Sequence, residues 1–568
     1  MTTHPQIPPQ DTDGPGPWWR EAVLYQIYPR SFADSNGDGI GDLRGIISRL
    51  DHLRDGTPSS LGVDALWLSP FYPSPQADFG YDISDYQDVD PVYGTLADFD
   101  ELVVEAHRRG LRVVVDLVMN HTSTEHPWFT ESRSSRANPK RNWYIWADPA
   151  PDGGPPNNWL SAFEKCGPAW TLDPATGQYY LHSFTPGQPD LNWREPAVRE
   201  AMRKVWRFWL DRGVDGFRAD VAHRLLKDER LRDNPPELAP ARRHVSVPGM
   251  RQRQLDLPEV HDVLRELREV LDSYPGLDGS LAEGRFVLGE VPISDDSRLA
   301  DYFGGEGMHT VFHIAFWEQP WEGAAFRRTV DGLLAAMRPG SWPTYALATH
   351  DISRTVSRFG GWGPARAAAV IMLTLPGTPC VYYGEEIGMA DAPPPAGLER
   401  DVDGRDGQRT PMQWDASGKG FGTGTPWLAP GPDAGRANVE AQRDDSESML
   451  GLYRRLIRYR GGSAALRRGG YRSLDSSGDS YVYLRQAAGE LLLVAVNFRH
   501  VPAQVEITGV DLPAAGRIEL STHAGRAGAT VPLGPLALGP LEAVVVRLAD
   551  GVPTDPGATA APSKGPAA

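Results

Sequence analysis

The sequence predicts an α/β fold: a (β/α)₈ TIM barrel with a subdomain inserted after its third strand and a C-terminal antiparallel β-sandwich. Three observations support this prediction. Short runs of β-branched and apolar residues alternate with amphipathic helical stretches over most of the chain. A segment rich in Trp, Pro, Asn and Gly follows the third run. From about residue 470 onward only short, alternating strand patterns remain.

The barrel prediction depends on eight predicted strands. Several of them are nearly continuous hydrophobic runs, as parallel strands covered on both faces should be. The helical stretches between them, such as 99–110 and 197–213, often end at a glycine. The predicted strands are 22–29, 63–70, 111–120, 214–221, 285–292, 309–316, 344–351 and 378–386.

The remaining segments define the domain boundaries. Residues 122–187 are too long for a loop and lack a clear helical period, which indicates an inserted subdomain. The barrel is then assigned to 18–121 and 188–465, and the sandwich to 466–550. Residues 1–17 and 551–568 are poor in apolar residues and rich in Pro, Ala and Gly, so they are predicted to be disordered.

Composition excludes several classes of partner. The net charge of −17 would repel nucleic acid, so the substrate is expected to be a neutral small molecule. No stretch approaches the roughly eighteen uninterrupted apolar residues that a membrane helix needs. The polar, proline-rich start carries an initiating Met and no secretory signal pattern, which predicts a soluble, cytoplasmic protein. Cys166 and Cys380 are expected to be reduced thiols. The sequence does not indicate an oligomeric state.

Polar side chains close four of the predicted strands. Because the carboxyl ends of barrel strands meet on one face, these side chains should converge at an active site. One such residue could belong to a structural ion pair, but four strand ends together favour a site. The residues are Asp116, Asn120 and His121 on the third strand, Arg218 and Asp220 on the fourth, Glu290 on the fifth, and His350 and Asp351 on the seventh.

Two of these carboxylates fit the chemistry of retaining glycoside hydrolysis, which needs a nucleophile and a protonated acid about 5–5.5 Å apart. Asp220 lies two residues after Arg218, on the same face of the strand, so a fixed cation is expected to keep it ionised as a nucleophile. Glu290 lies between VLG and VP. Apolar surroundings there would favour its protonated form, which suits an acid.

These residues lie in motifs that resemble a known family. DLVMNH (116–121), QPDLN (188–192), GFRADVAH (216–223), GEV (289–291) and ATHD (348–351) resemble the conserved regions of the α-amylase family of glycoside hydrolases. The segments YPRSFADSNGDGIGDLRGI, SPFYPSPQADFGYDISDY and GRDGQRTPMQW narrow the resemblance to its oligo-1,6-glucosidase and α-glucosidase branch. The resemblance covers roughly residues 18–550.

The resemblance implies a role for each site residue. Asp220 would be the nucleophile, Glu290 the acid/base, and Asp351 a third carboxylate that grips hydroxyls of the distorted sugar. Asp78 and Arg409 would close the pocket behind the non-reducing end, with Arg405 as the less favoured alternative to Arg409. Phe163 and Phe184 are either stacking or packing aromatics. The first glucose pocket would be lined by Asp78, Tyr81, His121, Arg218, His350 and Arg409.

The implied activity is that of an exo-acting, retaining α-glucosidase on short α-glucosides, including maltose, isomaltose and sucrose. It would proceed through a β-glucosyl-enzyme, with transglucosylation as a side reaction. The alternative is a transglucosylase or isomerase of the same family, such as a sucrose isomerase, trehalose synthase or glucosyltransferase. A non-catalytic scaffold relative is disfavoured because the carboxylates are present.

Linkage preference is expected to depend on Val221, which directly follows the nucleophile. In similar enzymes a Val at this position accompanies tolerance of α-1,6 links, although one wall residue contributes only about 1–3 kcal/mol of discrimination. The insert at 225–245 could override it by covering the same subsite. A mixed α-1,4 and α-1,6 preference is therefore expected, with long starch a poor substrate.

The segment DSNGDGIGD has the oxygen spacing of a calcium loop. It is not an EF-hand, because the twelfth loop position is Gly45 rather than Glu. It resembles the single structural cation loop after the first barrel strand in this family, binding Ca²⁺ or alternatively Mg²⁺ for loop rigidity; no organic cofactor is expected. The expected ligands are Asp34, Asn36, Asp38, the Ile40 carbonyl and Asp42.

Overall fold

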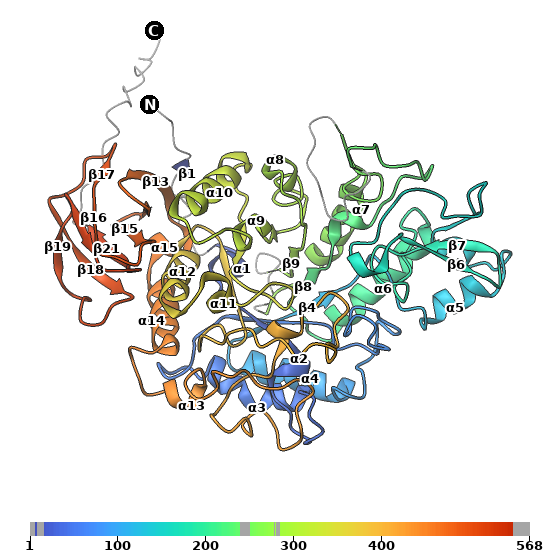
Figure 1. Ribbon diagram of the computed structural model, residues 1–568, viewed down its shortest axis with the longest axis horizontal. Helices are drawn as coiled ribbons and strands as arrows, with labels where there is room; N and C mark the ends of the chain where they lie inside the picture. The colour runs from blue at the N-terminus through green and yellow to red at the C-terminus, as the bar shows by residue number, and fades with distance from the viewer. Residues whose placement is uncertain (1–5, 8–15, 239–249, 278, 280–283, 549–568) are drawn as a thin grey trace, which may run out of the picture.

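The structure, a computed structural model, describes residues 6–7, 16–238, 250–277, 279 and 284–548 (Figure 1). Its centre is a sheet of eight parallel strands in the order β10-β9-β8-β4-β3-β2-β12-β11. Each strand falls inside one of the eight predicted segments, so the barrel prediction is confirmed. The strands are β2 (Leu24–Ile27), β3 (Ala65–Leu68), β4 (Arg112–Leu117), β8 (Gly216–Ala219), β9 (Phe286–Gly289), β10 (Thr310–Val311), β11 (Thr344–Ala346) and β12 (Thr378–Tyr382).

The sheet closes into a barrel where its two outer strands, β10 and β11, meet. Phe312 forms a single parallel bridge with Thr344. The hydroxyls of Thr310 and Thr344 lie 2.9 Å apart, and the His313 amide donates to the Thr344 carbonyl at 2.9 Å. These few contacts form the seam of the barrel.

Helices connect the strands and bury one apolar face against them. The α4 helix shows how the sequence sets such a boundary, because Thr95 and Asp98 form a reciprocal capping box at its start. Within the described residues no helix is both long and apolar enough to span a membrane. The longer helices are α3 (Leu43–Leu53), α4 (Leu96–Arg108), α6 (Pro196–Asp211), α7 (Val260–Asp272), α10 (Gly323–Ala336), α12 (Trp362–Thr374) and α14 (Met449–Gly462). The shorter ones are α1 (Trp18–Glu21), α2 (Pro29–Phe32), α8 (Asp296–Leu299), α9 (Ile314–Trp317), α11 (Thr355–Phe359), α13 (Val439–Gln442), α15 (Ala464–Arg468), η3 (Ala222–Arg224) and η4 (Asp406–Arg409).

The segment 122–187 lies on the opposite side of the barrel from the C-terminal strands (Figure 1). It contains a three-stranded antiparallel sheet in the order β5-β7-β6. It also contains the helix α5, which the sequence pattern did not predict; α5 is short, starts at Pro127 and is capped by the His126 side chain. Its elements are α5 (Pro127–Ser134), η1 (Arg141–Trp143), β5 (Trp146–Ala147), η2 (Glu164–Cys166), β6 (Trp170–Asp173) and β7 (Gln178–Leu181).

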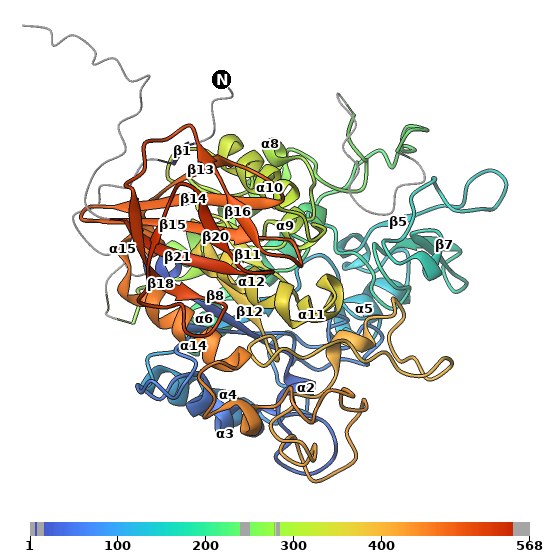
Figure 2. The same ribbon diagram turned by 60° about the vertical axis from the view of Figure 1, so that its left-hand side comes forward.

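The C-terminal strands form an antiparallel sheet that packs against α10 and α12 (Figure 2). Alternate residues such as Val482, Leu493 and Val544 face a second apolar core, which a small β16–β20 sheet covers. The predicted antiparallel sandwich is thus confirmed. Its strands are β13 (Gly470–Ser476), β14 (Ser480–Ala487), β15 (Glu490–Asn497), β16 (Ala503–Val505), β17 (Ile507–Thr508), β18 (Ala515–Ser521), β19 (Thr530–Pro532), β20 (Leu536–Leu538) and β21 (Ala543–Leu548).

One part of the predicted disordered N-terminus is ordered. Gln6 and Ile7 form the strand β1, which pairs antiparallel with Arg472 and Tyr471 of β13. The disorder prediction is wrong at these two residues, because the free edge of β13 offers backbone groups that an extended segment can pair with. Residues 1–5, 8–15 and 551–568 of the predicted disordered ends lie outside the described residues.

Candidate active site

The C-terminal ends of the barrel strands surround a cavity of about 290 Å³. This volume is near the lower end of the roughly 300–1,000 Å³ of small-molecule sites. Arg218 lies on β8, Asp220 directly follows β8, and Glu290 directly follows β9. Asp351 comes five residues after the end of β11. All four line the cavity, as the strand-end pattern predicted.

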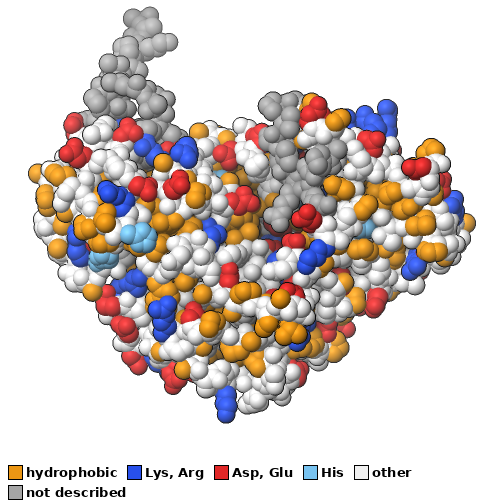
Figure 3. All heavy atoms as spheres, in the orientation of Figure 1, with side chains coloured by type: hydrophobic (Ala, Val, Ile, Leu, Met, Phe, Trp, Pro, Cys, Tyr) orange, Lys and Arg blue, Asp and Glu red, His pale blue; other side chains and the backbone are white. Residues whose placement is uncertain are grey.

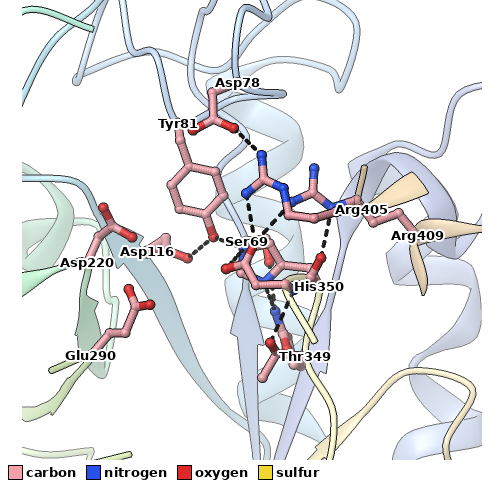
Figure 4. A network of polar contacts seen from close by, with 12 residues as sticks. Ser69, Asp78, Tyr81, Asp116, Asp220, Glu290, Thr349, His350, Arg405 and Arg409 are labelled. Atoms are coloured by element: carbon pink, nitrogen blue, oxygen red, sulfur yellow. Dashed lines mark hydrogen bonds and ion pairs between the residues drawn. The ribbon is translucent and has the colours of Figure 1, made fainter. Parts of the chain in front are cut away.

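One guanidinium group holds three carboxylates at the centre of the site. Arg218 Nη1 donates to Asp116 Oδ1 and to Asp220 Oδ1, both at 2.7 Å. Its Nη2 donates to Glu290 Oε2 at 2.5 Å. Asp220 and Glu290 therefore lie against neighbouring nitrogens of the same group and face one another (Figure 4).

This shared cation changes the expected electrostatics of Asp220. Burial raises the pKa of Asp220 well above its ordinary value; Arg218 opposes the rise, and the carboxylates of Glu290 and Asp116 add to it. The fixed cation that the sequence predicted beside Asp220 is present, but it is shared with Asp116 and Glu290; that it keeps Asp220 ionised stays a prediction.

Glu290 does not lie in the apolar surroundings that its sequence neighbours suggested. Besides Arg218, the backbone N–H of Val221 donates to its carboxylate at 3.2 Å. Val221 adopts a left-handed conformation with φ of 34°, which is strained for a β-branched residue. That conformation directs the Val221 amide toward Glu290 while the Val221 side chain lines the cavity.

The far wall of the cavity contains an ion pair between Asp78 and Arg405. Arg405 Nη2 lies 2.5 Å from Asp78 Oδ1, and Arg405 Nη1 donates to Asp351 Oδ1 at 2.8 Å. Figure 4 shows this pair across the Tyr81 ring from Asp220 and Glu290. Both members of the pair line the cavity.

The preference for Arg409 as the partner of Asp78 is therefore wrong, and Arg405 takes that place. Arg409 is fully buried and does not line the cavity. It donates to the His350 carbonyl at 2.8 Å and to Asp351 Oδ1 at 3.0 Å. The turn η4 separates the two arginines: Arg405 precedes it and reaches the cavity, whereas Arg409 ends it and points into the barrel wall.

Asp401 is a site residue that the sequence reasoning missed. Its carboxylate accepts from Arg405 Nε at 2.9 Å and from Arg409 Nη1 at 3.1 Å. Burial opposes its ionisation, but Arg405 and Arg409 hold the pKa of Asp401 at about 2. The spacing Asp401, Arg405, Arg409, four residues apart each time, was the signal in the sequence.

At neutral pH Asp351 is charged and His350 is not. Burial opposes ionisation of Asp351, but His350 and the guanidinium groups of Arg405 and Arg409 hold the pKa of Asp351 well below its ordinary value. Burial lowers the pKa of His350 to about 3, so it is neutral. The cavity thus presents an anionic Asp351 beside an uncharged ring.

Tyr81, His350 and Asp116 form a buried hydrogen-bonded chain. Gln26 Nε2 lies 2.8 Å from His350 Nδ1, and Tyr81 Oη lies 2.6 Å from His350 Nε2. An amide donating to Nδ1 leaves the ring proton on Nε2, so the imidazole donates to Tyr81 Oη. Tyr81 in turn donates to Asp116 Oδ2 at 3.0 Å. The chain fixes the Tyr81 ring, which stacks on His350 with centroids 5.2 Å apart.

The inserted segment supplies another wall. Phe163 and Phe184 both line the cavity and pack edge to face, 5.4 Å apart. The Arg405 guanidinium lies 4.9 Å from the Phe163 ring centre, and His121, whose pKa burial lowers to about 4, packs on Phe184. Further residues that line the cavity were not singled out from the sequence. They include Trp67, Arg224, Pro292, Phe312, Trp317 and Glu318.

Of the insert at 225–245, residues 239–245 lie outside the described residues.

In the predicted cation loop, the side-chain oxygens accept from backbone amides. Asp34 Oδ1 accepts from Gly37 N at 2.6 Å, and Asp42 Oδ1 accepts from Gly45 N at 2.7 Å, which caps α3. In the described part of the chain, no three His, Cys, Asp or Glu side chains gather as a metal site. The side-chain oxygens of Asp34, Asn36 and Asp38 are ligands that suit Ca²⁺ or Mg²⁺. Cation binding by this loop stays a prediction.

Comparisons with known proteins agree with this geometry. Residues 26–469 match the model of the α-amylase catalytic domain. A probable α-glucosidase of Rhizobium meliloti is 42% identical over 522 residues, covering 86% of this chain and 91% of the relative. An oligo-1,6-glucosidase of Parageobacillus thermoglucosidasius is 40% identical over 528 residues, covering 85% and 90%.

Solved structures with the same fold include transferring enzymes. The α-glucosyl transfer enzyme XgtA superimposes with a TM-score of 0.83 at 40% identity, covering 94% of this chain and 100% of that chain. The trehalulose synthase MutB of Pseudomonas mesoacidophila superimposes with a TM-score of 0.84 at 35% identity and the same coverage.

Proposed function

Because the chain belongs to the α-amylase family of glycoside hydrolases, we propose that it is an exo-acting, retaining α-glucosidase. Its substrates are short α-glucosides, from which it releases the terminal non-reducing glucose. The observation that carries this proposal is the ion pair between Arg405 and Asp78 at 2.5 Å in the cavity wall. A wall at that position stops the sugar chain behind one glucose unit, whereas an open cleft would let a long chain pass.

The proposed reaction is a double displacement. An Asp220 oxygen attacks the anomeric carbon and forms an ester bond, while the bond to the leaving oxygen breaks and Glu290 gives that oxygen its proton. Glu290 then takes a proton from water, whose oxygen attacks the same carbon and breaks the ester. The two inversions return the α-configuration. Arg218, which contacts both carboxylates, fixes their separation so that they flank the bond that breaks.

The other residues of the pocket would bind the glucose. Asp351, anionic at neutral pH, can accept hydrogen bonds from sugar hydroxyls, and these bonds strengthen as the ring distorts. Asp78 and Arg405 can bind the hydroxyls at the non-reducing end. The Tyr81 ring, fixed by His350 and Asp116, offers a flat face to the sugar.

Substrate comparison tests the proposal. We expect maltose and isomaltose both to be cleaved, because Val221 lines the cavity beside the nucleophile, and we expect soluble starch to be poor. The measurement is kcat/KM on maltose, isomaltose, sucrose and starch. Starch as the best substrate would contradict the closed pocket, and activity confined to maltose would contradict the role of Val221.

A transglucosylase or isomerase is the second candidate, because solved structures of the same fold include XgtA and MutB. The chemistry is the same up to the glucosyl-enzyme, and only the acceptor differs. Product analysis on maltose and sucrose separates the two: free glucose as the main product supports hydrolysis, and new disaccharides support transfer. Early-time proton NMR should show α-glucose first, and β-glucose would contradict the retaining assignment.

A further inference from the structure

A second, larger cavity of about 490 Å³ lies at the opposite end of the barrel. Val23, Asp64 and Arg112 line it, and they lie at the N-terminal ends of β2, β3 and β4. The catalytic carboxylates lie at the C-terminal ends of the strands. Further walls come from the helix α1, the loop after α3 and the helices α14 and α15.

This cationic cavity is unusual in an acidic protein. Six arginines line it against two carboxylates, Glu21 and Asp64, although the whole chain has a net charge of −17. On the face shown in Figure 3, by contrast, basic and acidic side chains are interspersed. The six residues are Arg54, Arg112, Arg454, Arg458, Arg460 and Arg467.

The two carboxylates of the cavity are already paired. Asp64 accepts from Arg54 at 2.7 Å, and Glu21 pairs with Arg467. Within the described residues, the other side chains of α14 that line the cavity, Arg454, Arg458 and Arg460, make hydrogen bonds only to backbone carbonyls. Within the described part of the chain, none of these three guanidinium groups forms an ion pair with a carboxylate, although Asp444 acts on Arg454, and Asp64 and Glu21 act on Arg460, at longer range.

The environment of Arg460 shows how unfavourable this arrangement is without an anion. Its side chain is 1% exposed. Burial lowers the pKa of Arg460 to about 9; the guanidinium groups of Arg485 and Arg467 add to this effect, and the carboxylates of Asp64 and Glu21 oppose it. In addition, the buried Nε atoms of Arg454, Arg460 and Arg467 have no hydrogen-bond partner among the residues that the structure describes. A group of cations that is short of acceptors attracts anions strongly.

We infer that the cationic cavity binds a small phosphate-bearing anion. Guanidinium groups donate paired hydrogen bonds that match the geometry of phosphate oxygens. Arg454 and Arg458, one helical turn apart on α14, project into the cavity from the same helix face, and Arg54 lines the cavity from the loop after α3. The shared chemistry is the phosphate group, either as free phosphate or as a phosphorylated sugar.

The test is calorimetric titration of the full chain with inorganic phosphate, pyrophosphate and glucose 6-phosphate, at an ionic strength held constant with potassium chloride. We expect one-to-one binding of at least one probe and a rise in Tm that chloride alone does not produce. Tightest binding by inorganic phosphate or pyrophosphate would identify a free-phosphate site, and tightest binding by glucose 6-phosphate a phosphorylated sugar.

Two substitutions place the binding in this cavity. Arg458→Gln and Arg454→Gln should each weaken binding by about tenfold, since each removes a charged donor. Arg458 is exposed, so its loss should leave the fold intact. Arg517→Gln, at an exposed position of β18, is the matched control and should bind like the wild type.

Absence of binding by all three probes, or unchanged affinity in both cavity variants, would overturn the inference. Turnover is not the readout, so the result does not depend on the proposed activity.

Discussion

The pairing of Arg405 with Asp78 makes a sharp prediction about sugar binding. Arg405→Gln removes a guanidinium that contacts Asp78 at 2.5 Å and Asp351 at 2.8 Å. Asp78→Asn removes the charge at the other end of the pair. If the two act together on the non-reducing end of the sugar, either substitution removes most of their joint contribution.

The expected size follows from the burial of both groups. A hydrogen bond to a charged group contributes about 1.5–3 kcal/mol, and breaking a buried pair costs about 3–5 kcal/mol because the partner is left uncompensated. We take about 3 kcal/mol for each single variant, which is roughly a 160-fold loss in kcat/KM. Groups in direct contact are coupled by about 0.5–3 kcal/mol. The double variant should therefore lose less than the product of the two single losses.

The assay is kcat/KM on maltose for wild type, both single variants and the double variant, with circular dichroism to check that each is folded. Arg400→Gln, at an exposed position of the same loop, is the control and should stay close to wild type. Two strictly multiplicative losses, or a wild-type value for Arg405→Gln, would refute the assignment of this pair to the glucose pocket.

Three further predictions concern catalysis, the cation loop and pH. Asp220→Asn and Glu290→Gln should each lower kcat by several orders of magnitude with the fold intact, and azide should restore turnover to Asp220→Gly with inverted product; near-wild-type kcat would remove their assigned roles. Chelation should lower Tm more than it lowers turnover at low temperature; if Asp38→Ala melts like wild type and ignores the chelator, the loop binds no cation. Burial lowers the pKa of His121 from 6.5 to about 4, so between these values the unfolded chain takes up a proton that the folded protein does not. The free energy of unfolding should then fall as the pH falls from 6.5 to 4, with roughly 3 kcal/mol of the loss due to His121. Urea unfolding at pH 7 and pH 4 should show a smaller loss in His121→Gln, and an equal loss would refute the argument.

The features that the sequence predicted well are those set by local pattern. Buried parallel strands need apolar side chains on both faces, so the runs around Val115 and Val287 could be recognised without any tertiary information. The carboxylates Asp220 and Glu290 were found for the same reason, because a charged residue at the end of such a run is conspicuous. Strand ends converge in a barrel whatever the loops do, so their meeting could also be predicted.

The features that failed depend on contacts between distant segments. Arg405 and Arg409 have the same chemistry four residues apart, and only the direction of the turn between them decides which one reaches Asp78. The surroundings of Glu290 are set by the Val221 amide and by Arg218, which its immediate neighbours in sequence do not reveal. The pairing of Ile7 with β13 likewise required a partner more than 460 residues away.

The seam between β10 and β11 is a weakly connected part of the barrel wall. Other neighbouring strands are joined by ladders, whereas these two are joined by one bridge, a pair of threonine hydroxyls and the His313 amide. Elements held by few contacts open first, well below the global unfolding free energy. Phe312, which forms the bridge, also lines the substrate cavity. Local opening of the barrel at this seam would therefore move a wall of the pocket. A sugar that packs against Phe312 would hold the two strands together. Hydrogen exchange of the His313 amide should then become slower.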